Sequence, residues 1–186
     1  MLNKELKLHL GCGERFLPGY THVDISDFSH IDYKSNVKEL NFIEDNSVEQ
    51  IYASHVLEYY DVVEVNEVLK EWMRVLKPSG ELKLAVPNFH TLVEVYKKTL
   101  DVDSVVGPII GRWKLSDGEM IYHKQIFNKK KLTEVLKKAG FRNISTWNWE
   151  DFIKEFPGYD DHSQAHFPHM DKANGIHVSL NLTCFK

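Results

Sequence analysis

KLHLGCG at residues 7–13 and PGYTHVDI at residues 18–25 together decide the fold of this 186-residue chain. The alternating leucines of the first stretch predict a short strand, and Gly11 and Gly13 predict a sharp turn where a ligand can approach the backbone. Asp24 ends the second predicted strand, where a carboxylate can accept hydrogen bonds from both hydroxyls of a ribose. The two stretches predict a nucleotide pocket at one edge of an α/β sheet; a plain glycine turn in such a protein is the alternative.

Length and composition bound the class of protein. The chain is long enough for one well-buried domain and short for two, so we expect a single domain over residues 1–186. A net charge of -4 gives no basic excess, and we expect no nucleic-acid partner. Cys12 and Cys184 form no C-x-x-C pair and predict reduced, buried thiols. The N-terminus lacks the apolar stretch of a signal peptide, and no apolar run could span a bilayer, so we expect a cytoplasmic protein without membrane insertion.

Predicted strands and helices alternate along the rest of the chain. Asp61 and Asn128 can each cap a helix, and Gly140 suits the left-handed position that ends the second of these. A further helix is expected over residues 89–100, with Phe89, Leu92, Val93, Tyr96 and Leu100 as its apolar positions. Strands are expected over residues 33–37, 48–54, 81–87, 142–149 and 176–185. Glycines and a proline break residues 101–125, and these residues and 150–175 are the candidate lid or acceptor-binding segments.

The order of these elements predicts a topology. Because strands alternate with helices, we expect a mostly parallel sheet with its ligand at the carboxyl edge of the strands. Because no helix is predicted between the last two strands, we expect them to pair antiparallel. The nine residues between Leu10 and Tyr20 leave hardly any room for the usual first crossover helix, and we expect a helical turn or loop there. One sheet face would then be thinly covered, and a second copy of the chain could close its apolar patch as a homodimer.

Four motifs in this order resemble those of class I S-adenosylmethionine-dependent methyltransferases of the small bacterial type. They are the glycine turn with its acidic strand end, ASHVLEY at residues 53–59, VLKPSGEL at residues 75–82 and KAGF at residues 138–141. The resemblance runs through nearly the whole chain. It implies a Rossmann-like methyltransferase fold whose seven-stranded sheet is mostly parallel with an antiparallel C-terminal strand pair. It also implies S-adenosylmethionine as the cofactor.

The resemblance implies which residues bind this cofactor. Gly11, Cys12 and Gly13 would lie along its methionine and ribose parts, and Asp24 would bind the ribose hydroxyls. Leu40, between Glu39 and Asn41, would flank the adenine. Ser54 and His55 would approach the methionyl end, although His55 could instead begin a helix and make only a backbone hydrogen bond. Glu58 would lie near the same edge, with a capping or structural role as its alternative.

Two positions depart from the family pattern. His9 stands where many relatives carry an acidic residue that helps to hold the methionine ammonium, and Arg15 stands at the usual third glycine. Binding of the methionine part is therefore expected to differ, with Arg15 facing the cofactor carboxylate.

Acceptor chemistry has fewer signals. Transfer to a hydroxyl needs a base, and His123 is the candidate, with a plain surface histidine as its alternative. Trp113 and Tyr122 could wall an acceptor pocket. Asp160, Asp161 and His162 could orient a polyhydroxylated acceptor; a metal site that also uses His166, His169 and Asp171 is the alternative, and we expect none because the spacings fit no closed site.

The sequence thus predicts a methyltransferase that acts on a small polar molecule, such as a sugar or sugar derivative, with O-methylation slightly favoured over N-methylation. A catalytically silent methyltransferase fold that serves as a binding or regulatory subunit is the first alternative. A nicotinamide-dependent enzyme is the second, although Phe16 stands where a dinucleotide fingerprint has its third glycine.

Overall fold

A computed structural model describes residues 5–186. Its main sheet has seven strands in the order β3-β2-β1-β4-β5-β11-β8. The strands are β1 (Leu6–Leu10), β2 (Thr21–Asp24), β3 (Tyr33–Lys34), β4 (Val48–Ser54), β5 (Leu76–Pro87), β8 (Arg142–Thr146) and β11 (Ser179–Phe185). The first five are parallel, and β11 pairs antiparallel with both β5 and β8. This confirms the predicted mixed sheet, with β11 between its two antiparallel partners.

The main core lies between the sheet and two helices, α1 (Glu64–Val75) and α4 (Lys129–Lys138). Trp72 of α1 is fully buried there, as are Leu132 and Leu136 of α4. Both predicted caps are present. The Asp61 carboxylate accepts hydrogen bonds from the N–H groups of Val63 and Glu64, and the Asn128 side chain accepts one from Lys131.

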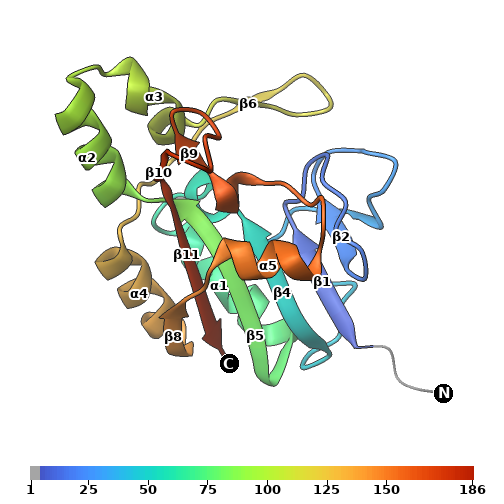
Figure 1. Cartoon of the computed structure of the whole chain (residues 1–186). Helices are drawn as coiled ribbons and strands as arrows, with labels where there is room; N and C mark the ends of the chain where they lie inside the picture. Colours follow the sequence, from blue (N-terminus) through green and yellow to red (C-terminus); the bar gives the residue numbers. More distant parts are fainter. Residues whose placement is uncertain (1–4) are drawn as a thin grey trace.

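The opposite face of the sheet is covered by α5 (Trp149–Glu155), which Figure 1 shows in front of β1, β4 and β5. Phe152 of α5 stacks on the buried Tyr52 of β4, with Leu17 and Tyr20 in the same cluster. The loop from residue 11 to 20 has no helix, as predicted. Helix α5 thus covers part of the face on which an apolar patch was expected. The homodimer stays a prediction.

A third group of elements stands over the carboxyl ends of the strands (Figure 1). It comprises α2 (Phe89–Thr99), α3 (Asp103–Ile110), the hairpin of β6 (Trp113–Lys114) and β7 (Met120–Ile121), and the pair of β9 (His166–Phe167) and β10 (Ile176–His177). The described residues also form two one-turn helices, η1 (Leu57–Tyr59) between β4 and α1 and η2 (His162–Gln164) between α5 and β9.

Residues 101–125 correct one prediction. Helix α3 runs through Gly107 and Pro108 instead of breaking there. The Asp101 carboxylate accepts from the N–H of Asp103 at the start of the helix, and Val105 is buried against α2. Packing therefore offsets the single hydrogen bond that Pro108 cannot donate.

Five other element predictions were wrong in detail. The strand expected over residues 33–37 ends at Lys34, and the strand expected over residues 81–87 already begins at Leu76. The strand expected to reach residue 149 ends at Thr146, because Asn148 caps α5 by accepting from the N–H of Glu150. A helix therefore does lie between β8 and β11. The strand expected over residues 176–185 is split into β10 and β11. In α2 the buried residues are Leu92 and Val95, whereas Tyr96 and Leu100 are exposed.

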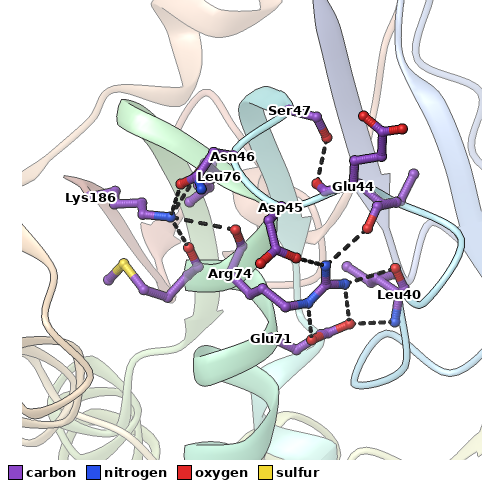
Figure 2. A network of polar contacts seen from close by, with 11 residues as sticks. Leu40, Glu44, Asp45, Asn46, Ser47, Glu71, Arg74, Leu76 and Lys186 are labelled. Carbon is purple, nitrogen blue, oxygen red and sulfur yellow. Dashed lines mark hydrogen bonds and ion pairs between the residues drawn. The ribbon is translucent and has the colours of Figure 1, made fainter.

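Arg74 at the end of α1 fixes the loop that follows β3 (Figure 2). Its guanidinium donates to the carbonyls of Leu40 (2.9 Å) and Ile43 (3.0 Å) and to the carboxylates of Asp45 and Glu71. Glu71 also accepts from the N–H of Leu40 at 2.8 Å. This network holds Leu40 in the core, where it is fully buried.

Within residues 5–186, none of the helices combines the length and the apolar character needed to cross a membrane.

Candidate cofactor and acceptor site

The glycine turn after β1 has the conformation expected from the sequence. Gly11 and Gly13 have φ angles of 61° and 56°, in the left-handed region that favours glycine. A Cβ at Gly11 would lie 2.6 Å from Cγ2 of Val56, so no other residue fits there. The turn leaves a bare backbone surface at the carboxyl end of β1.

Asp24 closes this turn from the next strand. Its Oδ2 accepts a hydrogen bond from the N–H of Gly13 at 2.8 Å, and its Oδ1 accepts one from the N–H of Ser26 at 2.7 Å. Only 7% of the residue is exposed. Each carboxylate oxygen keeps a second lone pair, so Asp24 can still accept hydrogen bonds from a ligand.

A cavity of about 860 Å³ opens over this turn. Trp113 reaches across it from the β6–β7 hairpin, with Cζ2 3.9 Å from the place of a Cβ on Gly13. Residues from 107–124 and 159–170 form much of the wall. Both candidate lid segments therefore contribute to the same site.

The cavity brings together most of the residues singled out from the sequence. Among these, its wall includes Gly11, Cys12, Gly13, Arg15, Asp24, Ser54, His55, Trp113, Tyr122 and His123. Asp161, His162, His166 and His169 join them, whereas Asp160 and Asp171 do not line it.

Leu40 lies outside the cavity wall, held in the core by the Arg74 network (Figure 2). Asn36 and Val37 line the wall beyond Asp24 instead. Sequence reasoning missed both, because the strand before them, β3, is only two residues long and fixes the position of the loop poorly. The signal that could have indicated Asn36 and Val37 is their position shortly after the carboxyl end of this strand.

A buried polar cluster lies beneath the turn. Tyr52 and Tyr159 donate hydrogen bonds to Oδ2 of Asp161 at 2.6 and 3.0 Å, and the hydroxyl of Tyr159 lies 3.3 Å from Nε2 of His9. Burial lowers the pKa of His9 to about 3, so its imidazole is neutral. Although burial alone would raise the pKa of Asp161, hydrogen bonds from Ser163 and Tyr52 keep it below its usual value. Asp161 is therefore an ionised carboxylate within the wall.

Arg15 lines the cavity and also makes a hydrogen bond to the segment after α5. Its Nε donates to the backbone carbonyl of Asp160 at 2.9 Å, which ties the glycine loop to the segment after α5. Arg15, which stands at the position of the missing third glycine, thus holds the C-terminal wall of the cavity.

Three ionisable side chains meet at the far wall. Nδ1 of His55 lies 3.2 Å from Oε1 of Glu58, and Nε2 of His123 lies 3.8 Å from the same oxygen. Burial lowers the pKa of His123, and the charge of Glu58 partly opposes this shift. The Glu58 side chain caps no helix; it is completely buried. His55 has a φ of 56° and uses its side chain as well as its backbone, with Nε2 3.1 Å from the hydroxyl of Ser179.

Across residues 5–186 no group of three or more His, Cys, Asp or Glu side chains is arranged to hold a metal ion. In the segment 159–171, Asp161 is already bound by two tyrosines and Asp160 pairs with Lys172 at 3.1 Å.

Comparisons with known proteins identify the fold. Residues 8–84 match the family model described as "Methyltransferase domain". A SAM-dependent methyltransferase from Archaeoglobus fulgidus has a TM-score of 0.59 and 17% identity, over 98% of this chain and 86% of that one. A Thermotoga maritima protein described as a SAM-dependent methyltransferase and possible histamine N-methyltransferase has a TM-score of 0.60 and 16% identity, over 100% and 84%.

A third similar structure is the 1,6-didemethyltoxoflavin-N1-methyltransferase of Burkholderia thailandensis, with bound S-adenosylhomocysteine. Its TM-score is 0.56 and its identity 13%, over 97% of this chain and 70% of that one. A search of curated protein sequences finds no match. Together, the family match and the sheet order show that the chain has the Rossmann-like fold of class I S-adenosylmethionine-dependent methyltransferases.

Proposed function

We propose that this protein is an S-adenosylmethionine-dependent methyltransferase that acts on a small polar molecule. The observation that carries the proposal is the cavity over the glycine turn. Its volume of about 860 Å³ falls within the range of about 300 to 1,000 Å³ that is typical of small-molecule sites. It also extends from Asp24, the carboxylate proposed to bind the ribose, to a group of histidines, which gives space for an acceptor beside the cofactor.

The residues present fit the cofactor. Asp24 keeps free acceptor lone pairs for two ribose hydroxyls, and the place of a Cβ on Gly13 is open, with Cζ2 of Trp113 as its nearest atom at 3.9 Å. Asn36 and Val37 would lie at the adenine end and Ser54 at the methionyl end, and the Burkholderia structure holds S-adenosylhomocysteine in a related fold. When bound, the cofactor supplies an activated methyl group, so the protein has to position the acceptor and exclude water.

The histidine-lined wall supports transfer to a hydroxyl, as in a sugar or sugar derivative. Such an acceptor must lose a proton, and His123 is neutral and lines the cavity. Asp161 and His162 line it too and could bind further hydroxyls, whereas Asp160 faces Lys172. We propose His123 as the base and O-methylation as the reaction.

Isothermal titration calorimetry with S-adenosylhomocysteine tests cofactor binding. We expect Asp24→Asn to weaken binding roughly 10- to 100-fold, since a hydrogen bond to a charged group contributes about 1.5 to 3 kcal/mol. Asp27→Asn is the matched control, because this carboxylate is 74% exposed. Absence of binding by the wild type at millimolar ligand would overturn the proposal.

Turnover is tested separately, by methyl release against a panel of sugars, sugar derivatives and small amines. Transfer to a hydroxyl compound supports the proposal, and transfer only to amines would replace O-methylation by N-methylation. Cofactor binding with no turnover on any acceptor would favour the silent binding subunit. A thermal shift with NAD but not with S-adenosylhomocysteine would favour a nicotinamide-dependent enzyme.

A further inference from the structure

Glu58 is a buried carboxylate without a hydrogen-bond donor. Its side chain is fully buried in η1, and neither Oε1 nor Oε2 has a hydrogen-bond partner. Most buried carboxylates are paired with a cation or accept several hydrogen bonds, because an isolated buried charge is unstable. Two imidazoles that line the cavity, those of His55 and His123, lie within 4 Å of Oε1.

The hydrogen bond of His123 fixes where its proton lies. Nδ1 is 3.0 Å from the carbonyl oxygen of Pro108, which can only accept, so Nδ1 carries the hydrogen. In the neutral ring Nε2 then carries a lone pair, and Nε2 lies 3.8 Å from Oε1 of Glu58. This distance is beyond a hydrogen bond, so Glu58 does not occupy the lone pair.

The tautomer of His55 follows from the same reasoning. The Ser179 hydroxyl donates its one hydrogen to Oδ1 of Asn181 at 2.8 Å, and the amide nitrogen of Asn181 donates to the carbonyl of Ser163. The Ser179 oxygen must therefore accept from Nε2 of His55, 3.1 Å away. This leaves the Nδ1 lone pair of His55 facing Oε1 of Glu58 at 3.2 Å.

Three hydrogen-bond acceptors, namely Oε1 of Glu58, Nδ1 of His55 and Nε2 of His123, thus face one another at one buried point. A proton between two of them removes the repulsion between their lone pairs. We propose that Glu58 and His55 share a proton behind the cavity wall, and that Glu58 acts through His123 as the positioning residue for removal of the proton from a hydroxyl acceptor. This inference rests on the proposed function. It adds a residue that holds the base in its reactive form and stabilises the imidazolium that the reaction produces.

The chemical step balances with these groups. The acceptor oxygen forms a bond to the methyl carbon while the carbon–sulfur bond breaks and leaves its electron pair on sulfur. The hydroxyl proton goes to Nε2 of His123, whose Nδ1–H stays on the Pro108 carbonyl. Oε1 of Glu58, which shares its proton with His55, then faces the imidazolium across 3.8 Å.

The backbone builds this arrangement. The carbonyl of Glu58 accepts from the N–H groups of Lys124 (2.8 Å) and Gln125 (3.1 Å), which sets the 123–125 segment over η1. Gly111 packs against His123 so closely that a Cβ would lie 2.0 Å from Nε2. The other titratable groups near the cluster are Tyr59, against the His123 ring, and His162 and His177, near His55.

Nitrogen-15 NMR of the histidine rings tests the inference without an acceptor. In the wild type we expect neutral His123 to carry its hydrogen on Nδ1. In Glu58→Gln, which keeps the size of the side chain, we expect the pKa of His123 to fall further, because the carboxyl oxygen that faces its Nε2 is lost. Glu58→Asp should restore part of the shift. Glu67→Gln, an exposed neighbour on α1, should leave it unchanged.

Two results would overturn the inference: a wild-type His123 that carries its hydrogen on Nε2, or an unchanged His123 titration in folded Glu58→Gln. The first measurement stands even if the variant does not fold. Because both are made without cofactor, they are independent of the S-adenosylhomocysteine titration. Failure of cofactor binding would overturn the methyltransferase proposal and leave the proton assignment in place.

Discussion

At the scale of single residues, the neutral His9 links the site to pH-dependent stability. Its pKa is about 3 in the folded protein, because it is buried, and 6.5 is the ordinary value in an unfolded chain. The unfolded state therefore binds more protons between these values, and the free energy of unfolding must fall as the pH drops from 6.5 toward 3. We expect His9→Gln to make this fall shallower by about 1.4 kcal/mol per pH unit.

Urea unfolding at several pH values between 4 and 6.5 measures the slope, so a constant stability loss in the variant does not affect the result. His90→Gln is the control, since His90 is exposed. Equal slopes in His9→Gln and the wild type would show that His9 is not buried neutral.

The residue scale also shows what the sequence can predict. The conformations of Gly11 and Gly13 and the place of Asp24 were predictable, because each depends on a turn and two adjacent strands. The cofactor contact expected of Leu40 depended on the loop after β3, and the Arg74 network, which no local pattern reveals, holds Leu40 in the core (Figure 2). Glu58 and His123 lie 65 residues apart and meet only through tertiary contacts.

At the scale of elements, α5 takes the place on the sheet that the missing first crossover helix leaves open. Phe152 stacks on Tyr52 with 4.7 Å between ring centroids and is 3% exposed. We expect Phe152→Ala to lower the free energy of unfolding by about 3 to 5 kcal/mol, as a large buried side chain does when truncated. The measurement is urea unfolding, with Phe16→Ala, 59% exposed, as a control that should change much less. Similar losses in the two variants would contradict the covering role of α5.

Helix α5 was predictable in principle. Phe152, Phe156 and Tyr159 have the spacing of one helical face, and Asn148 is a good capping residue. The stretch from residue 142 to 149 carries β-branched and aromatic residues and reads as a continuous strand, which hid the cap within it. The spacing of residues cannot show where this helix packs. Helix α5 follows β8, the sixth strand of the main sheet in chain order, yet it covers the sheet face beside β1, the first strand.

At the scale of the whole molecule, β11 is an interior strand of the sheet, although it is the last strand in chain order. It lies between β5 and β8 and pairs with both, so the parallel half and the antiparallel half join only through residues near the end of the sequence. Lys186, which follows β11, extends this joint to α1 (Figure 2). Its ammonium donates to the carbonyls of Met73 and Leu76 at 2.6 and 2.7 Å and to Oδ1 of Asn46 at 2.7 Å.

These acceptors include a carbonyl in the last turn of α1, where helix carbonyls lack partners within the helix. We expect Lys186→Met to lower the free energy of unfolding by about 1.5 to 3 kcal/mol, the contribution of hydrogen bonds to a charged group. Lys154→Met, whose ammonium is exposed beside Asp151, should change it by less than about 0.5 kcal/mol. Denaturant unfolding followed by both near- and far-ultraviolet circular dichroism should give one transition. If Lys186→Met separated the two signals, β11 would not be what joins the two halves of the sheet.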